Sequence, residues 1–166
     1  MKNTRGFSLV EALVAFGVIA VIGLLAALAV GSARSTSRDA VRLSNVRQIQ
    51  VVMEQYFQNS SNYPAGDALP LGDMVESSCL GSGGFASSCS GMDTIYLRSV
   101  PGTLETGLSG QVVCGTPLRQ AFCYSQKESG KAYSLSFELE HDIPYTDLKK
   151  GSNCALPEGL RPGLCP

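Results

Sequence analysis

The sequence is dominated by the apolar stretch LVEALVAFGVIAVIGLLAALAVG, which occupies residues 9–31 and contains Glu11 as its one charged residue. About 20 apolar residues are enough to cross a bilayer as a helix, whereas the apolar core of a cleaved secretory signal has only about 7–15 residues. Arg34 follows the stretch, and no convincing cleavage site separates the two. The stretch therefore predicts a helix that stays on the mature protein and crosses a membrane.

The remaining charge is distributed unevenly along the 166 residues, although the formal net charge is only −1. The segment that follows the apolar stretch contains one acid, Asp39, and four arginines: Arg34, Arg38, Arg42 and Arg47. The rest of the chain holds an excess of acids. The near-neutral balance argues against a nucleic-acid-binding protein with a strongly basic surface, so nucleic acid is not indicated as a partner.

The cysteines place the C-terminal part of the chain outside the cytoplasm. Lys2 and Arg5 precede the apolar stretch and favour a cytoplasmic N-terminus, but the arginines after the stretch favour the opposite orientation. An even number of cysteines in a small, weakly charged domain indicates disulfides and an oxidising compartment. The cysteines therefore favour the orientation with a cytoplasmic N-terminus. The disulfide candidates are Cys79, Cys89, Cys114, Cys123, Cys154 and Cys165.

Sequence alone leaves 15 possible pairings of six cysteines. Pairing of sequence neighbours is favoured because each bridge would then close a local loop. No C-x-x-C pair is present, and structural zinc sites usually show that spacing, so a metal held by cysteine is disfavoured.

Helical periodicity continues beyond the apolar stretch, and no proline occurs before Pro64. The first half of this helix is apolar all round, whereas the second half has one apolar face and needs a globular partner. The segment from Asn59 to Pro64 is predicted to end the helix. The apolar face is formed by Leu43, Val46, Ile49, Met53, Tyr56 and Phe57, which follow one another at helical spacing.

Two features of this helix carry charge. One face of the helix carries Arg34, Arg38 and Arg42. The simplest interpretation is that these arginines are solvated or contact lipid headgroups, and the alternative is that they pair with acids on neighbouring subunits. DNA binding is the least favoured interpretation. Glu11 either lies near the membrane interface and reaches water, or meets a positive partner inside an assembly. A carboxylate at the bilayer centre costs about 2.5–3.5 kcal/mol, and a free α-amino group would offset that cost.

The C-terminal part predicts a small antiparallel sheet. Residues 95–100 and 120–126 are short β-prone runs, and residues 132–140 alternate strictly between apolar and polar side chains, as a half-buried strand does. Residues 65–94 read as a loop-rich connection. Within it the glycine-rich segment 81–84 reads as part of a flexible loop closed by Cys79 and Cys89, and it lacks the lysine of a phosphate-binding loop. A meander of these strands covering the amphipathic half of the helix gives an α+β fold.

The N-terminus resembles a known signal. Lys2-Asn3-Thr4-Arg5-Gly6 followed by Phe7-Ser8-Leu9-Val10-Glu11 is similar to the class III signal peptide of type IV prepilins and of type II secretion pseudopilins. This resemblance implies cleavage between Gly6 and Phe7 by a prepilin peptidase, methylation of the new Phe7 amine, and pairing of Glu11 with that amine on a neighbouring subunit. The helix exit at Asn62-Tyr63-Pro64 is similar to that of major pseudopilins and related pilins.

The resemblance implies a pilin-like layout of four parts: a leader peptide (1–6), a transmembrane assembly segment (7–31), an amphipathic continuation of the helix (32–59) and a disulfide-bearing β domain (60–166). The implied function is that of a structural subunit of a type IV pilus-like extracellular filament, for adhesion, motility or DNA uptake. The alternatives are a pseudopilin of a type II secretion system and a monomeric membrane-anchored binding domain.

The implied partners are identical and related subunits, the prepilin peptidase, an inner-membrane assembly platform and, before assembly, membrane lipid. The implied location is the cytoplasmic (inner) membrane as a single-pass protein, and then the extracellular filament.

No enzymatic activity and no cofactor are predicted. The sequence has no G-x-S-x-G motif, and no cysteine is placed as a nucleophile beside the single histidine, His141. Asp142 and Asp147 flank a loop and are weak candidates for calcium ligands, although a solvated turn is the simpler interpretation.

Overall fold

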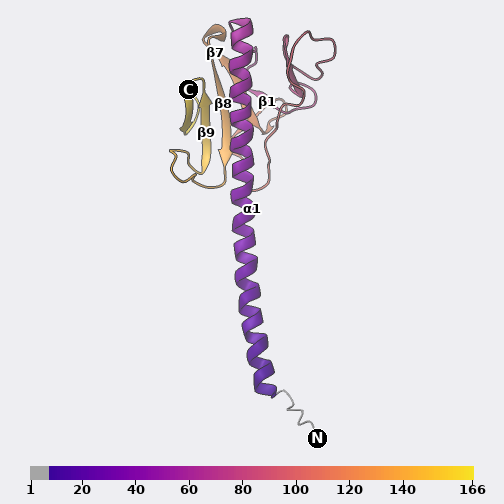
Figure 1. Ribbon diagram of the computed structural model, residues 1–166. Helices are drawn as coiled ribbons and strands as arrows, with labels where there is room; N and C mark the ends of the chain where they lie inside the picture. The colour runs from indigo at the N-terminus through magenta and orange to yellow at the C-terminus, as the bar shows by residue number, and fades with distance from the viewer. Residues whose placement is uncertain (1–7) are drawn as a thin grey trace. The chain divides into compact units, whose positions relative to one another are not determined.

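The computed structural model describes residues 8–166, in which one long helix, α1 (Leu9–Ser60), is followed by short strands (Figure 1). The chain divides into two units between Ser37 and Arg38, and each unit is described by itself below. This helix and the antiparallel strands after it confirm the predicted α+β, pilin-like layout.

The described part of the first unit consists of the N-terminal portion of α1. Its large apolar side chains are exposed all round the helix, with Phe16 at 75% and Leu28 at 65% of full exposure. By length and composition α1 is able to cross a membrane. An apolar helix with no buried face needs lipid or other helices around it, because water solvates such a surface poorly.

The second unit packs the C-terminal part of α1 against a five-stranded antiparallel sheet of order β1-β7-β8-β9-β10. The strands are β1 (Leu69–Leu71), β7 (Phe122–Lys127), β8 (Ala132–Leu139), β9 (Gly151–Leu156) and β10 (Gly159–Pro162). From β7 to β10 each strand pairs with its successor, so most of the sheet is a meander.

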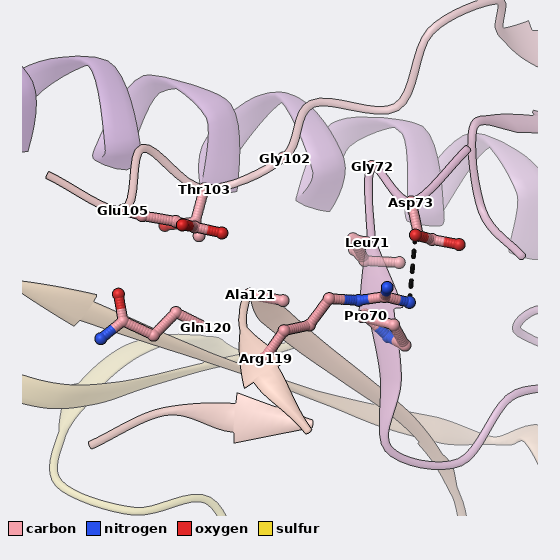
Figure 2. Close-up of a pocket in the computed structure, with 10 residues that line it drawn as sticks. All are labelled: Pro70, Leu71, Gly72, Asp73, Gly102, Thr103, Glu105, Arg119, Gln120 and Ala121. Carbon is pink, nitrogen blue, oxygen red and sulfur yellow. Dashed lines mark ion pairs between the residues drawn. The ribbon is translucent and has the colours of Figure 1, made fainter. Parts of the chain in front are cut away.

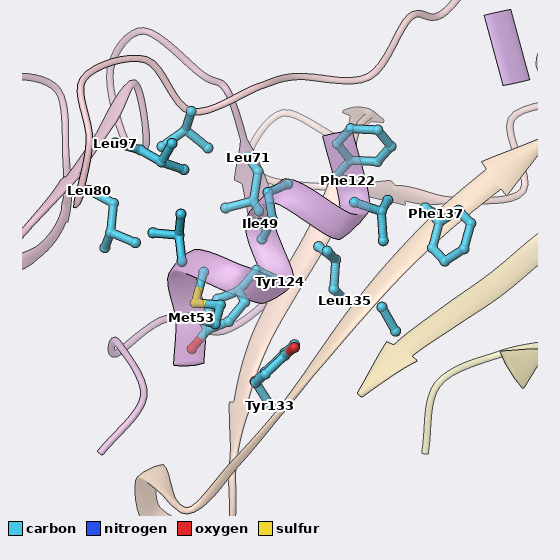
Figure 3. Packing of buried hydrophobic residues seen from close by; sticks show 14 of the residues in the cluster. Ile49, Met53, Leu71, Leu80, Leu97, Phe122, Tyr124, Tyr133, Leu135 and Phe137 are labelled. Carbon is cyan, nitrogen blue, oxygen red and sulfur yellow. The ribbon is translucent and has the colours of Figure 1, made fainter. Parts of the chain in front are cut away.

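The core lies between α1 and the inner face of this sheet (Figure 3). Ile49 and Met53 of α1 are fully buried, as are Leu135 and Phe137 of β8 and Phe122 of β7. The alternation of β8 is what directs its apolar side chains to this face. Each side chain of this kind contributes about 1.5–3 kcal/mol on burial, so the core is the main force that holds the helix to the sheet.

The end of α1 is fixed by local backbone geometry and by aromatic packing. Ser61 has a positive φ of 58° and donates its N–H to the carbonyl of Phe57, which is a left-handed helix ending of the kind that glycine usually forms. Tyr63 then packs against Tyr133, with ring centroids 4.7 Å apart. The chain therefore leaves the helix close to the predicted exit.

Two smaller sheets complete the second unit. One has the order β3-β2-β4 and comprises β2 (Cys79–Gly81), β3 (Gly84–Ala86) and β4 (Ile95–Leu97). The other pairs β5 (Val113–Cys114) with β6 (Arg119–Gln120).

These strands correct two predictions. The 95–100 run does form a strand, β4, but it pairs with β2 and does not join the meander. The prediction of a loop-rich connection for residues 65–94 is incomplete, because this segment holds β1, β2 and β3, and Leu80 of β2 is fully buried. Glycine and serine lower the strand propensity of this segment, and tertiary pairing overrides that local preference.

The six cysteines form three disulfides between sequence neighbours, as the spacing favours. The bridges are Cys79–Cys89, Cys114–Cys123 and Cys154–Cys165, with sequence separations of 10, 9 and 11 residues. Each bridge closes a local loop within the second unit.

Candidate functional site

The first candidate is the apolar part of α1 with Glu11. The Glu11 side chain is exposed in the first turn of the helix, and the neighbouring large apolar side chains are exposed as well. A carboxylate on an otherwise apolar helical surface gains most when a positive group approaches it on entry into an apolar assembly. Gly6 and Phe7, the residues predicted to be processed, lie outside the described residues.

The second candidate is a buried charge cluster in the second unit, formed by Arg38, Asp39, Arg42, Glu140 and His141. Arg42 is fully buried and Asp39 is 1% exposed. Both belong to α1, whereas Glu140 and His141 follow β8 directly in the chain. The cluster therefore ties the helix to the end of the central strand.

The Arg42 guanidinium is the centre of this cluster. It donates to the Asp39 carboxylate at 2.9 Å and to the Glu140 carboxylate at 2.7 Å. It also donates to the backbone carbonyls of Leu104 and Thr106. Buried charge is tolerated only when it is paired and hydrogen-bonded, and Arg42 meets both conditions.

Asp39 is held by four polar contacts. Besides Arg42, its donors are the backbone N–H groups of Glu140 at 2.9 Å and of His141 at 3.0 Å. The His141 ring lies with Nδ1 3.1 Å from the carboxylate and remains half exposed. The chain direction after β8 is therefore set by a side chain of the helix.

The interpretation of the arginine stripe as outward-facing is wrong for two of its three members. Arg38 forms a bidentate ion pair with Glu140, in which Nε and Nη2 donate to the two carboxylate oxygens at 2.7 Å and 2.6 Å. The Arg42 side chain points into the cluster. Only Arg34 is exposed, and it lies in the first unit. Sequence reasoning missed this because Glu140 is about 100 residues away in the chain; the nearest local signal was Asp39, three residues before Arg42.

The carboxylates at the end of β8 also hold the long segment that connects β4 to β5. Glu138 is 2% exposed and accepts hydrogen bonds from the backbone N–H groups of Ser109, Gln111 and Val112. Burial raises the pKa of the Glu138 carboxyl, but a hydrogen bond from the Ser109 hydroxyl, together with these backbone hydrogen bonds, outweighs burial and leaves the pKa lowered. Gly107 takes a positive φ of 85° against Glu140, where any side chain would collide with the carboxylate.

The cluster predicts acid lability of the fold. The Arg38 hydrogen bonds, supported by Arg42, lower the pKa of the Glu140 carboxyl from 4.5 to about 2, although burial opposes them. A carboxyl whose pKa is lower in the folded state stabilises that state above its unfolded pKa, and the contribution is lost as the pH falls. We expect the free energy of unfolding to fall by an amount of the order of 3 kcal/mol between about pH 5 and pH 2.

Denaturant titrations of the full chain in detergent at a series of pH values measure this loss. Glu140→Gln removes the titrating group, so its free energy of unfolding should change less over the same range, leaving the share of Glu138. Identical pH profiles for the two proteins would contradict the assignment to Glu140.

The calcium candidates are not brought together with a third ligand. Asp142 accepts a hydrogen bond from the backbone N–H of Lys150 and lies 3.6 Å from the Lys149 ammonium group, and Asp147 is exposed. Within residues 8–166 no group of three or more histidine, cysteine or acidic side chains is placed to hold a metal ion.

One polar cavity of about 210 Å³ lies between β1, β6 and the segment that follows β4 (Figure 2). Its charged side chains include Arg119, whose guanidinium pairs with the Asp73 carboxylate at 3.0 Å, and Glu105. Histidine and cysteine are absent from the described residues that line it.

The comparisons with known proteins give one result, at the N-terminus. Residues 1–30 match the family model described as the prokaryotic N-terminal methylation motif. No match was found among the curated proteins or among the solved structures. The matched range includes the basic leader, Gly6, Phe7, Glu11 and most of the apolar stretch. The described residues have a pilin-like α+β layout. In residues 1–30 the chain therefore carries the class III signal peptide of type IV pilins and pseudopilins.

Proposed function

We propose that this chain is a structural subunit of a type IV pilus-like extracellular filament. The observation that carries the proposal is the methylation motif in residues 1–30, placed on a helix whose apolar surface is exposed all round. Such a helix needs lipid before assembly and neighbouring helices after it. The β domain, with its three disulfides, suits an oxidising environment outside the cytoplasm.

Processing supplies the switch between these two states. A prepilin peptidase cuts between Gly6 and Phe7, and the Phe7 amine is methylated. The new amine carries a positive charge, and Glu11 of a neighbouring copy carries a negative one. Each charge is costly in an apolar medium, and the two offset one another only when the subunits dock in the correct register. Adhesion, motility and DNA uptake are the roles such a filament serves.

A pseudopilin of a type II secretion system is the second candidate. The observation that favours it is the helix exit, where α1 ends at Ser60 and Asn62-Tyr63-Pro64 leads the chain away with Tyr63 buried. In this case the same processing and docking would build a short filament confined to the cell envelope.

Two measurements on cells that express the full chain test the proposal. Mass spectrometry of the mature protein should find a methylated Phe7 at the N-terminus, and an uncut or unmethylated N-terminus would contradict processing. Immunogold electron microscopy, with an antibody against residues 60–166, should then label long surface fibres. Label confined to the envelope would favour the secretion pseudopilin, and a full-length monomer would favour the anchored binding domain.

A further inference from the structure

The loop of residues 140–150, which joins β8 to β9, presents Tyr145 at its tip. This tyrosine has a relative exposure of 108%, the largest among the exposed large hydrophobic residues that the structure describes. Single exposed apolar residues are common on protein surfaces and need no explanation by themselves. Two further features set Tyr145 apart from an ordinary exposed residue: its backbone conformation, and the hydrogen bonds that fix the loop.

Tyr145 occupies a backbone position that favours glycine. The carbonyl of Ile143 accepts hydrogen bonds from the backbone N–H of Thr146 at 3.3 Å and from its hydroxyl at 2.9 Å, which closes a four-residue turn. Pro144 is the second residue of this turn, and Tyr145 is the third, with a φ of 61°. A turn with proline second and a positive φ third normally carries glycine or asparagine there. A bulky residue in that conformation is strained, and such strain concentrates at functional sites.

The turn is held on a firm base. The N–H of Ile143 donates to the carbonyl of Leu148, whose side chain is 2% exposed. The N–H of Lys149 donates to the side chain of Asn153 in β9, and the N–H of His141 donates to the Asp39 carboxylate. The tyrosine ring is therefore presented outward by a fixed loop, so little conformational entropy is lost when it contacts a partner.

The position of the loop within the second unit identifies the partner. The bonds from Asp39 place the start of the loop at the end where α1 enters this unit. Arg38 comes only seven positions after Gly31, the last residue of the apolar stretch. Seven residues of helix rise about 10 Å, and the same length of extended chain spans about 25 Å. When the apolar stretch crosses a bilayer, this end of the second unit is tethered close to the headgroup region, which is about 5–8 Å deep on each side.

We propose that Tyr145 inserts into the interfacial region of the membrane before assembly, and that the 140–150 loop is thus a second, reversible membrane contact of the unassembled subunit. The inference rests on the membrane-anchored stage of the proposed function. Tyrosine suits this region because its ring is apolar and its hydroxyl remains hydrated, which is why tyrosine is enriched at both membrane interfaces.

The charges around the ring indicate insertion of an aromatic side chain and not adsorption by charge. Lys149 and Lys150 are balanced by Asp142 and Asp147, and Asp142 lies 3.6 Å from the Lys149 ammonium group. The loop therefore carries no net positive charge with which to attract anionic lipid. The contact is expected to form with zwitterionic phosphatidylcholine as well as with bilayers that contain phosphatidylglycerol.

The chain contains no tryptophan, so Tyr145→Trp in the full chain creates a single fluorescent reporter. Reconstituted into phosphatidylcholine vesicles, this variant should show a blue-shifted emission. Lipids brominated near the headgroup end of the acyl chains should quench it more strongly than lipids brominated near the chain ends.

Ser129→Trp is the matched control. Ser129 is also exposed and also has a positive φ, 53°, but it lies in the turn before β8, at the opposite end of that strand from the 140–150 loop. Its emission should remain that of a water-exposed tryptophan. Equal shifts in the two variants, or no shift for Tyr145→Trp, would overturn the proposal. A shift for Tyr145→Trp that occurs only in assembled filaments would overturn it too, with a second copy of the chain as the partner in place of lipid.

Flotation of the vesicles separates failure of this inference from failure of the proposed function. A Tyr145→Trp chain that floats with the vesicles but shows no blue shift disproves only the loop contact. A chain that does not float disproves the anchored stage and this inference with it.

A second variant, Tyr145→Gly, separates a role at the membrane from a role in folding. Its thermal unfolding midpoint in detergent should equal or exceed that of the unmodified chain, because glycine relieves the strain. A lower midpoint would assign the tyrosine to folding and overturn its role at the membrane.

Discussion

Arg42→Met should lower the free energy of unfolding of the second unit by about 3–5 kcal/mol, which is a large fraction of the 5–15 kcal/mol typical of a domain. Methionine fills a similar volume but leaves the buried Asp39 carboxylate without its guanidinium partner. It also removes the donors to the carbonyls of Leu104 and Thr106. Breaking one side of a buried charge pair costs more than the pair contributes, because the remaining charge stays in a poorly solvated site.

Urea titration of the full chain in detergent, followed by the near-ultraviolet circular dichroism of the buried tyrosines, measures this change. Arg47→Met is the matched control, because Arg47 lies on the same helix but is exposed. Exposed substitutions of this kind usually change stability by no more than about 0.5 kcal/mol. Similar losses for the two variants would show that the buried charge cluster does not hold the helix to β8.

Glu11→Ala should abolish incorporation of the subunit into filaments while leaving peptidase cleavage intact. The carboxylate is exposed on the first turn of α1. The proposed cleavage within the methylation motif would create a new amine at Phe7, a few residues before Glu11, in each copy. Without Glu11, the amine of an incoming neighbour enters the apolar filament core unpaired, and an unpaired charge there costs several kcal/mol. A loss of this size reduces an assembly equilibrium constant by orders of magnitude.

The measurement is the amount of processed subunit recovered in sheared filaments relative to the membrane fraction. Glu11→Asp keeps the charge with a shorter side chain and is expected to retain measurable incorporation. Normal incorporation of Glu11→Ala would rule out the docking role of this carboxylate.

The sequence predicts well those features that depend on neighbouring residues. The exposed apolar helix follows from the composition of residues 9–31, and β8 ends at Leu139, one residue before the end of the predicted 132–140 strand. The helix ends at Ser60, inside the segment expected to end it. In each case the period of the apolar residues, or a local breaker, carries the information.

The sequence predicts poorly those features that depend on distant residues. Residues 151–156 contain glycine, serine and asparagine and have weak strand propensity, yet they form β9 because β8 offers a row of backbone partners. From the sequence, Arg42 is predicted to be one of several solvated arginines on the helix. Its partners, Glu140 and the carbonyls of residues 104 and 106, come from later parts of the chain and leave no local signal. For the candidate site, the motif around Glu11 was visible in the sequence, but the buried charge cluster was not.

The local pairing of the cysteines sets how a fibre built from this chain would respond to tension. Each bridge joins residues only 9 to 11 positions apart, and none of the three joins the helix to a strand. A subunit pulled until it unravels would therefore lengthen everywhere except within three small covalent loops. An extended residue spans about 3.3–3.6 Å, and each bridge still spans 5.1–6.0 Å between its Cα atoms, so these loops shorten the fully drawn-out chain by roughly 85 Å. No disulfide fastens the helix to the sheet, so apart from the backbone that connects them only non-covalent contacts resist their separation.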